Sequence, residues 1–582
     1  MKHSIVVFIF MALVAHCFAT EPSIAMNQVG FYPASPKIAV VINSPASAYF
    51  YILDQHKKDT VYSGKLQPPV QSSYSSTITR IADFSDFKQS GTFTIVVKDI
   101  PPSPVFTIGK HVLHNVSVAS LKGFYYQRSN MALDEKYAGQ WKRPAGHPDT
   151  NVLIHASAAG KNRPEGYIIA SPGGWYDAGD YNKYIVNSGI TMGTLFAAYE
   201  DFPTYYKALA SNIPETGNKV PDILNEAVYN IRWMLTMQDA NDGGVYHKCT
   251  NAVFDGVVMP GVTKAPRYVV QKSTAASLDF AAVMAQAARI YKKFKAAFPG
   301  LSDSCIQAAQ SAWQWSVNNP AIVYDQDEMN RHFSPAVTTG AYGDKILQDE
   351  WFWAAAELSI TTGDIQFIQN KNVETALPMN IPTWSKVNMM GVYSILKNKN
   401  FFKKSKLDVQ QIQDDFIAYA STLVNGGNTA FKTVMGQSPR DFIWGSNAVA
   451  MNQSMLLIKA FRVTNDKKYL NAGMSNLDYI LGRNATGYCF LTGTGTTYPI
   501  HIHHRPSQAD GITEPIPGLL AGGPNPGRQD KCKYPFTETE TSYVDEDCAY
   551  ACNEITINWN APLVYVSAAL ESLQAKAALS LR

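Results

Sequence analysis

The first hundred residues show the hydrophobic pattern of short β-strands. Runs of β-branched or aromatic residues occur at 37–42, 48–53, 91–97 and 105–108, and Pro, Ser, Asp and Gly separate them. Runs of this length between turn-forming residues are typical of strands, and several at short spacing indicate a β-sandwich. We therefore expect a small all-β sandwich over residues 22–108.

From about residue 110 onward the apolar positions repeat at helical spacing instead. In 221–235 the repeat begins with Pro221, which is favourable in the first turn of a helix. Several segments are Ala-rich and apolar nearly all round, so we expect them to pack on more than one side. The expected helices lie near 113–128, 221–235, 274–294, 302–316, 349–362, 408–424, 446–463, 469–482 and 562–579. The long Gly-, Pro- and Thr-rich stretch 484–545 interrupts them, and loops of that length are usually functional.

Composition limits the classes of molecule that this protein is expected to bind and the compartment in which it is expected to act. The chain has 582 residues and a net charge of +3, with no basic run that could follow a phosphate backbone, so we expect no nucleic acid. Lys2 and His3 precede the apolar run 5–15, and Ala19 offers a cleavage site, so residues 1–19 read as a signal peptide of a secreted or periplasmic protein. No later stretch has the roughly 20 apolar residues of a membrane span. We expect a monomer.

Six cysteines follow the predicted signal peptide, and export makes disulfides chemically feasible. Six thiols allow 15 pairings, among which sequence cannot choose. Three of them lie close together around an acidic stretch, where we expect one structural bridge; a metal site at Cys548 and Cys552 is less favoured because no His lies nearby. The six are Cys249, Cys305, Cys489, Cys532, Cys548 and Cys552.

Two acidic stretches carry residues suited to glycosidic bond hydrolysis. That reaction needs one protonated carboxyl group that donates to the leaving oxygen and one ionised carboxylate that activates water or attacks. The later stretch crowds Asp545, Glu546, Asp547 and Glu554 together, and Glu554 borders an apolar helix entry. Like charges and desolvation would therefore favour its protonated form. Helix capping and solvation are the alternative, which we prefer for Glu546 and Asp547.

The earlier stretch holds Asp177 and Asp180, three residues apart and on one face if the backbone is helical. Gly173, Gly174 and Gly179 allow tight turns close to a ligand. An N-cap pair or a calcium loop is the alternative, although the spacing does not match an EF-hand.

A third cluster comprises His501, His503, His504 and Arg505. Such residues could ligate zinc or donate hydrogen bonds to hydroxyl groups, and we favour hydrogen bonding because the spacing is not that of a helical metalloprotease motif.

Five tryptophans are candidates for stacking on sugar rings, although core packing is the safer interpretation for any one of them. Trp384 lies in a predicted loop, which makes it a better candidate than Trp353 in an Ala-rich helix. The five are Trp175, Trp315, Trp353, Trp384 and Trp444.

Together these stretches resemble glycoside hydrolase family 9, an inverting cellulase family with an (α/α)6 barrel. Residues 23–31 look like the opening of the immunoglobulin-like module that precedes many of its catalytic domains, and 121–129, 174–184, 444–447 and 479–484 look like barrel motifs. The most specific match is the closing motif, in which Tyr543, Asp545, Tyr550, Glu554, Thr556 and Asn560-Ala561 fill every position. The resemblance implies a multidomain chain: an immunoglobulin-like sandwich over 22–108 and a catalytic (α/α)6 barrel over 109–582.

The resemblance also implies roles for single residues. Glu554 would be the general acid and Asp180 the general base, with Asp177 holding the same water. Inversion predicts that the acid and base carboxyls lie roughly 6.5–9.5 Å apart. The expected substrate-binding residues are His503, Arg505, Asp545, Tyr550 and Trp384, of which Asp545 would also support the site.

The resemblance also bears on zinc and calcium sites. Relatives with this N-terminal module often carry zinc on two Cys and two His; His147 and His155 lie in the corresponding region, but no Cys occurs between 18 and 248, so we expect no zinc. Residues 340–350 resemble a stretch in which an acidic pair binds calcium, which makes Asp349 and Glu350 candidate ligands. An ordinary acidic first turn of a helix is the alternative. The chemistry itself requires no cofactor.

The leading expectation is an inverting, endo-acting hydrolase of β-1,4-glucan, with soluble or amorphous glucan preferred over crystalline cellulose. An exo-acting relative that releases cellobiose, glucose or glucosamine is the alternative among enzymes, and loop lengths at the cleft ends would decide. From another class, a non-catalytic carbohydrate-binding protein would not need Asp177, Asp180 and Glu554 together.

Overall fold

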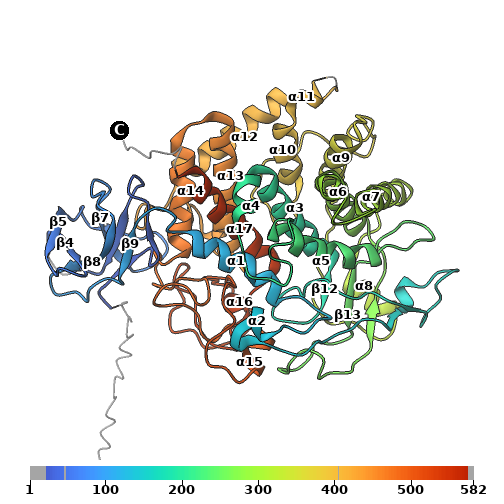
Figure 1. The fold of residues 1–582 in the computed structure, drawn as a ribbon, viewed down its shortest axis with the longest axis horizontal. Helices are drawn as coiled ribbons and strands as arrows, with labels where there is room; N and C mark the ends of the chain where they lie inside the picture. Colours follow the sequence, from blue (N-terminus) through green and yellow to red (C-terminus); the bar gives the residue numbers. More distant parts are fainter. Residues whose placement is uncertain (1–20, 45–46, 404, 575–582) are drawn as a thin grey trace, which may run out of the picture.

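The structure is a computed structural model that describes residues 21–44, 47–403 and 405–574. The predicted signal peptide, residues 1–19, lies outside this range. A small β domain sits beside a larger helical domain (Figure 1). The last strand of the first domain ends at Ile108, and the first helix of the second begins at His114.

The small domain is a sandwich of two sheets around one apolar core. One sheet has the order β1-β3-β7-β6 and the other β2-β9-β8-β4-β5, and all neighbours are antiparallel except β2 and β9. Phe31, Phe50, Phe84, Phe93 and Phe106 fill the space between the sheets. The strands are β1 (Ser23–Met26), β2 (Gly30–Phe31), β3 (Ile38–Ile42), β4 (Tyr49–Asp54), β5 (Thr60–Lys65), β6 (Val70–Gln71), β7 (Ile78–Asp83), β8 (Gly91–Val97) and β9 (Phe106–Ile108).

The large domain is built from paired helices. Helix α17 packs against α1, α3 and α13, while α6 packs against α3, α7 and α9, so that neighbouring helices enclose a common core. The helices are α1 (His114–Tyr126), α2 (Glu135–Ala138), α3 (Ile185–Asp201), α4 (Pro203–Ala208), α5 (Asp222–Thr236), α6 (Thr274–Tyr291), α7 (Leu301–Asn318), α8 (Gln326–His332), α9 (Gln348–Thr362), α10 (Asn388–Lys397), α11 (Lys399–Phe402), α12 (Val409–Gly426), α13 (Ser446–Thr464), α14 (Lys467–Ile480), α15 (Arg505–Ala509), α16 (Tyr550–Asn553) and α17 (Ile557–Leu573).

Several helices differ from expectation, among them α10 and the short helices α2, α4, α8, α11, α15 and α16, which were not predicted. Helix α3 was not predicted, because its sequence is rich in β-branched residues and glycine and lacks a polar face; nearly all of it is buried. Helix α17 begins at Ile557, five residues before the predicted start, and contains Pro562. The predicted end of this helix, residue 579, lies outside the described residues.

Five short strands gather beside the helices, in a sheet that the periodicity did not indicate. Its order is β11-β10-β14-β13-β12. The strands are β10 (Val152–Ile154), β11 (Ile168–Ile169), β12 (Lys183–Tyr184), β13 (Lys248–Asn251) and β14 (Arg267–Val269). This sheet brings Tyr184 and Lys248 into direct pairing next to the acidic Asp177–Asp180 loop.

Buried polar contacts join the two domains. The amide of Asn27 donates to Asp478 at 2.8 Å, and the hydroxyl of Tyr32 donates to Glu571 of α17 at 2.6 Å. Because these partners are buried, they orient the sandwich against the barrel as well as adding contact area.

A disulfide joins Cys532 to Cys548, while Cys249, Cys305, Cys489 and Cys552 are buried free thiols. The bridge therefore uses two of the three cysteines around the acidic stretch, as expected. Within the described part of the chain, no helix has the length and apolarity needed to cross a membrane.

Candidate active site

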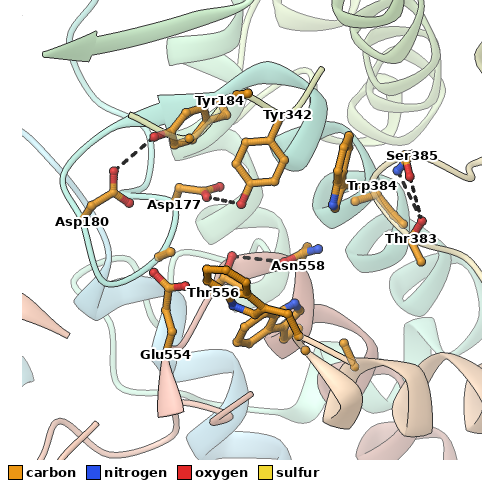
Figure 2. A pocket seen from close by; sticks show the side chains of 18 of the residues that line it. Asp177, Asp180, Tyr184, Tyr342, Thr383, Trp384, Ser385, Glu554, Thr556 and Asn558 are labelled. Carbon is orange, nitrogen blue, oxygen red and sulfur yellow. Dashed lines mark hydrogen bonds between the residues drawn. The ribbon is translucent and has the colours of Figure 1, made fainter. Parts of the chain in front are cut away.

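A cleft of about 970 Å³ lies at one end of the helical domain. Asp177, Asp180 and Glu554 all line it, although Glu554 is several hundred residues away from the other two in sequence. Figure 2 shows these three carboxyl groups near one end of the cleft, with Trp384 toward the other.

Asp177 is buried and held by two donors. The side-chain amide of Asn187, in α3, donates to Oδ1 at 2.6 Å, and the hydroxyl of Tyr342 donates to Oδ2 at 2.7 Å. Burial, and next the charge of Asp180, raise the pKa of Asp177 to about 8, and the two hydrogen bonds oppose that rise. Its oxygens are thus fixed in place.

Asp180 has a different set of partners. The amide of Asn182 and the hydroxyl of Tyr184 both donate to its Oδ2, the latter at 3.2 Å. No hydrogen bond to its Oδ1 occurs within the described residues, and that oxygen belongs to a cleft-lining side chain. Asp180 therefore has one oxygen anchored and one available to a ligand.

Glu554 enters the cleft just before α17. Burial raises its pKa to about 8, with further contributions from the charges of Asp180 and Asp177; Arg505 and a hydrogen bond from Trp444 act in the opposite direction. A carboxyl group with this pKa is protonated at neutral pH and can donate a proton.

The loop that carries His503 and Arg505 packs against the acidic loop. A Cβ atom on Gly179 would lie 2.2 Å from the carbonyl oxygen of His503, so only glycine permits this approach. Arg505 Nη1 donates to the carbonyl of Gly179 at 2.9 Å, and its Nε donates to the carbonyl of Asp255 at 2.9 Å. Both His503 and Arg505 line the cleft.

Asp545 lies behind this loop and is not among the cleft-lining residues. Its carboxylate accepts the backbone N–H groups of Ile500 at 2.7 Å and His501 at 2.9 Å, and the amide of Asn553 at 2.9 Å. This geometry fits the predicted support of the site, but not a direct contact with sugar.

Aromatic side chains line the cleft beside the carboxyl groups. Trp384 packs edge-on against Tyr342, with ring centroids 5.2 Å apart, and Trp444 lies 5.5 Å from Tyr550. All four line the cleft. The other stacking candidates, Trp175, Trp315 and Trp353, are buried in the core, as the more cautious interpretation had it.

The calcium candidates Asp349 and Glu350 belong to a larger group that also includes Asp279 of α6 and Asp344. Each of the four side chains is buried and has at least one carboxylate oxygen without a hydrogen-bond partner. Burial raises the pKa of Asp344 to about 6 and the pKa of Asp279 and Glu350 well above their usual range, with neighbouring carboxylates adding to it. Such oxygens fit a hard cation. Among the described residues, no group of three or more His, Cys, Asp or Glu has an arrangement that could hold a metal ion, so these side chains would have to move to bind one.

The two histidines of the zinc region have protein partners. His147 Nδ1 lies 2.9 Å from the hydroxyl of Tyr176, and His155 Nε2 lies 2.9 Å from the carbonyl of Pro335. The expected absence of zinc stays a prediction.

Sequence reasoning missed four side chains at the site: Tyr184, Asn187, Tyr342 and Phe254. Tyr184 ends the 174–184 motif and Asn187 follows it closely, so both could have been suspected. Tyr342 lies in the 340–350 stretch, which had been considered only for its acidic pair, and Phe254 carries no sequence signal. Phe254 is 45% exposed and lies 5.5 Å from the guanidinium of Arg505.

Comparison with known proteins agrees with this architecture. The family model described as Glycosyl hydrolase family 9 matches residues 114–567, and the one described as Cellulase N-terminal ig-like domain matches residues 19–101. A similar protein is the xyloglucan-specific endo-β-1,4-glucanase BoGH9A of Bacteroides ovatus, 43% identical over 95% of this chain and 94% of that protein. Endoglucanase D of Acetivibrio thermocellus is 31% identical over 96% of this chain and 84% of its own length.

Solved structures agree as well. A Bacteroides ovatus GH9 structure superposes with a TM-score of 0.88 at 42% identity, covering 95% of this chain and 99% of that one. An endoglucanase structure from Alicyclobacillus acidocaldarius gives 0.83 at 29% identity, covering 94% and 99%. These matches confirm the predicted immunoglobulin-like sandwich and (α/α)6 barrel. The chain is a glycoside hydrolase that belongs to family 9.

Proposed function

We propose that this protein is an inverting endo-β-1,4-glucanase whose substrate is xyloglucan or a related soluble β-1,4-glucan. The observation that carries the proposal is the gathering of Asp177, Asp180 and Glu554 in one aromatic-lined cleft, with Glu554 protonated at neutral pH. The name of the Bacteroides ovatus relative supports xyloglucan as the glucan to test first.

In the proposed reaction, Glu554 donates its proton to the glycosidic oxygen as the bond to the anomeric carbon breaks. Water attacks that carbon from the opposite face, and Asp180 takes a proton from the water. Asp177 helps to hold this water with an oxygen fixed by Tyr342 or Asn187. Because the water enters opposite the leaving group, the product has the inverted configuration.

The cleft lining supports binding of several sugar units. Trp384 lies beyond Tyr342 from the catalytic end (Figure 2). Phe254 and Arg505 line the cleft next to Gly179, on the Asp180 side. Aromatic side chains that extend along the cleft away from the carboxyl groups could contact several sugar units, which supports binding of a chain longer than a single sugar.

Hydrolysis of soluble xyloglucan and of unbranched soluble β-1,4-glucan, with viscosity and reducing ends followed together, tests the proposal. A fast viscosity loss per new reducing end is expected, with xyloglucan cleaved at least as fast as the unbranched glucan. Slow viscosity loss with release of one small sugar would indicate the exo-acting alternative. Binding without hydrolysis, identical in wild type and Glu554→Gln, would favour the carbohydrate-binding alternative.

We also propose that Asp279, Asp344, Asp349 and Glu350 bind a structural calcium ion. The support is their unpartnered carboxylate oxygens. Asp344 follows the loop that carries Tyr342, and Asp349 accepts the backbone N–H of Val387 at 2.7 Å, just after the Trp384 loop. Calcium would then steady both aromatic loops of the cleft and take no part in the chemistry.

We also propose that the protein is exported to the periplasm or out of the cell and that it is a monomer. Both rest on the sequence alone.

A further inference from the structure

A lysine is buried behind the catalytic loop without an acidic partner. Lys248 of β13 has no exposed surface, and its Nζ donates to neutral oxygens of three residues: Gln326 Oε1 at 2.6 Å, Gly340 O at 2.7 Å, and Thr339 Oγ1 at 3.0 Å and O at 3.4 Å. Among the described residues no carboxylate forms an ion pair with this amine. A buried cation without a counter-ion is costly. Burial lowers the pKa of Lys248 to about 7, and the charge of Asp180 opposes that shift.

A chain of hydrogen bonds leads from Lys248 to Asp180. Lys248 donates to the Thr339 hydroxyl, which lies 2.6 Å from the hydroxyl of Thr250. Thr250 donates to Oδ1 of Asn182 at 3.1 Å, and the amide of Asn182 donates to Oδ2 of Asp180. Each hydroxyl has one proton, and the Thr250 hydroxyl also reaches the carbonyl oxygen of Asn251 at 2.8 Å. When Thr250 gives its proton to Asn182, every donor of the chain points from the lysine toward the carboxylate. Bonds aligned in one direction polarise one another.

A second connection runs through Tyr184. Lys248 and Tyr184 are paired residues of neighbouring strands, and the Lys248 Nζ lies 5.5 Å from the Tyr184 ring centroid. The Tyr184 hydroxyl donates to the same Oδ2 of Asp180 at 3.2 Å. Oδ2 of Asp180 is thus held by three donors: the backbone N–H of Asn182 at 3.3 Å, the side-chain amide of Asn182 and the hydroxyl of Tyr184.

We propose that Lys248 is a positioning residue for the catalytic base: through Thr339, Thr250, Asn182 and Tyr184 it orients Asp180, and its positive charge favours the carboxylate form. The inference rests on the proposed function, in which Asp180 accepts a proton from water.

The need for such a charge follows from the other groups around Asp180. Asp177 lies on the same loop and Glu554 lies across the cleft, and the charge of Asp180 contributes to the raised pKa of both carboxyl groups. Arg505 and His503 face it from the adjacent loop, but Arg505 is bound to backbone carbonyls and is expected to contact substrate. Arg267 is also buried and donates to Oδ1 of Asn182 at 3.1 Å, but its charge is paired with Asp149 at 3.0 Å. Lys248 is a buried cation without such a carboxylate partner among the described residues, and it does not line the cleft.

The test is the pH dependence of kcat/KM on a neutral soluble glucan, so that only enzyme groups titrate. In the wild-type profile, kcat/KM rises with pH along an acidic limb. In Lys248→Met we expect the midpoint of this limb to lie about one pH unit higher, so that kcat/KM at a given pH on the limb is about tenfold lower. Lys248→Arg should keep the limb near its wild-type position. Lys459→Met, which removes a buried lysine that pairs with Asp201 far from the cleft, is the matched control and should leave the limb unchanged.

Tyr184→Phe and Thr250→Val, which interrupt one connection each, should move the limb in the same direction by less. If Lys248→Met does not fold, these two variants test the role of Lys248 in its place. A folded Lys248→Met enzyme whose whole profile is lowered uniformly, or interrupting variants with the wild-type limb, would overturn the inference and leave the proposed function standing. A wild-type protein that hydrolyses no β-glucan at any pH would overturn both.

Discussion

The hydroxyl of Tyr342 donates a 2.7 Å hydrogen bond to Oδ2 of Asp177, across 165 positions of sequence. With Asn187 on the other oxygen, the carboxyl group that is expected to hold the attacking water has both oxygens held by protein donors. The catalytic geometry therefore depends on a loop that the sequence analysis singled out only for its acidic pair.

Tyr342→Phe should lower kcat about five- to tenfold, the equivalent of one hydrogen bond of about 1 kcal/mol, with a smaller change in KM. The reason is that Asp177 loses a fixed orientation while the aromatic ring that packs on Trp384 is kept. Steady-state kinetics on soluble glucan measure it, with Tyr74→Phe at the domain boundary as control. A larger rise in KM than fall in kcat would show that the hydroxyl serves binding.

Activity should fall on the alkaline side with a midpoint near pH 8. The pKa of Glu554 is raised to about 8, so its proton is present below that pH and is lost above it, and a general acid without its proton cannot assist the leaving group. The pH profile of kcat/KM measures this, and circular dichroism over the same range checks that the fold persists. An alkaline limb centred below pH 6.5 would contradict the assignment.

Calcium should raise the melting temperature, and a chelator should lower it. At calcium a hundredfold above its Kd the gain would be about 2.7 kcal/mol. Because burial and mutual repulsion raise the pKa of these carboxyls, Asp344 to about 6, protons compete with the ion at low pH. The gain should therefore be larger at pH 7.5 than at pH 5.

Glu350→Gln should remove most of this calcium response, whereas Asp327→Asn, at the exposed start of α8, should keep it. Isothermal calorimetry gives the stoichiometry. A melting temperature that is the same with calcium and with chelator at both pH values would rule the site out.

Phe254→Ala should raise KM for long glucan chains about three- to tenfold, because one aromatic contact contributes about 0.5–1.5 kcal/mol. Phe254 lines the cleft beside Arg505. Val262→Ala is the matched control: it removes another exposed apolar side chain from the same loop, one that does not line the cleft. Equal effects of the two substitutions would contradict a direct sugar contact.

Tyr32→Phe should lower the free energy of unfolding by about 1.5–3 kcal/mol, because the hydroxyl donates to the buried Glu571 carboxylate of α17. Urea unfolding measures the change. Tyr49→Phe, at a tyrosine that is 45% exposed on the sandwich, should be nearly neutral. A neutral Tyr32→Phe would mean that the domains are held together mainly by their apolar contacts.

The local hydrophobic pattern was sufficient to predict a helix or strand wherever a segment combined strong periodicity with an ordinary composition. Helices α5, α6 and α13 and strands β3, β4 and β8 lie close to their predicted ranges. Helix α3 was missed because its Gly- and Thr-containing sequence has weak intrinsic helix propensity. Burial among other helices stabilises it, and sequence alone does not report burial.

By itself, the sequence determined the two-domain plan and named Asp177, Asp180 and Glu554, since the acid and base chemistry needs those residue types within recognisable motifs. Only the tertiary structure decided which side chains surround them. Tyr342 reaches Asp177 from a distant loop, and Lys248 is linked toward Asp180 through Thr339. Asp279 lies close to Glu350, and Asp545 holds a loop. Hydrogen bonds and charges act over a few ångströms of space, and only folding brings residues so distant in the chain to that range.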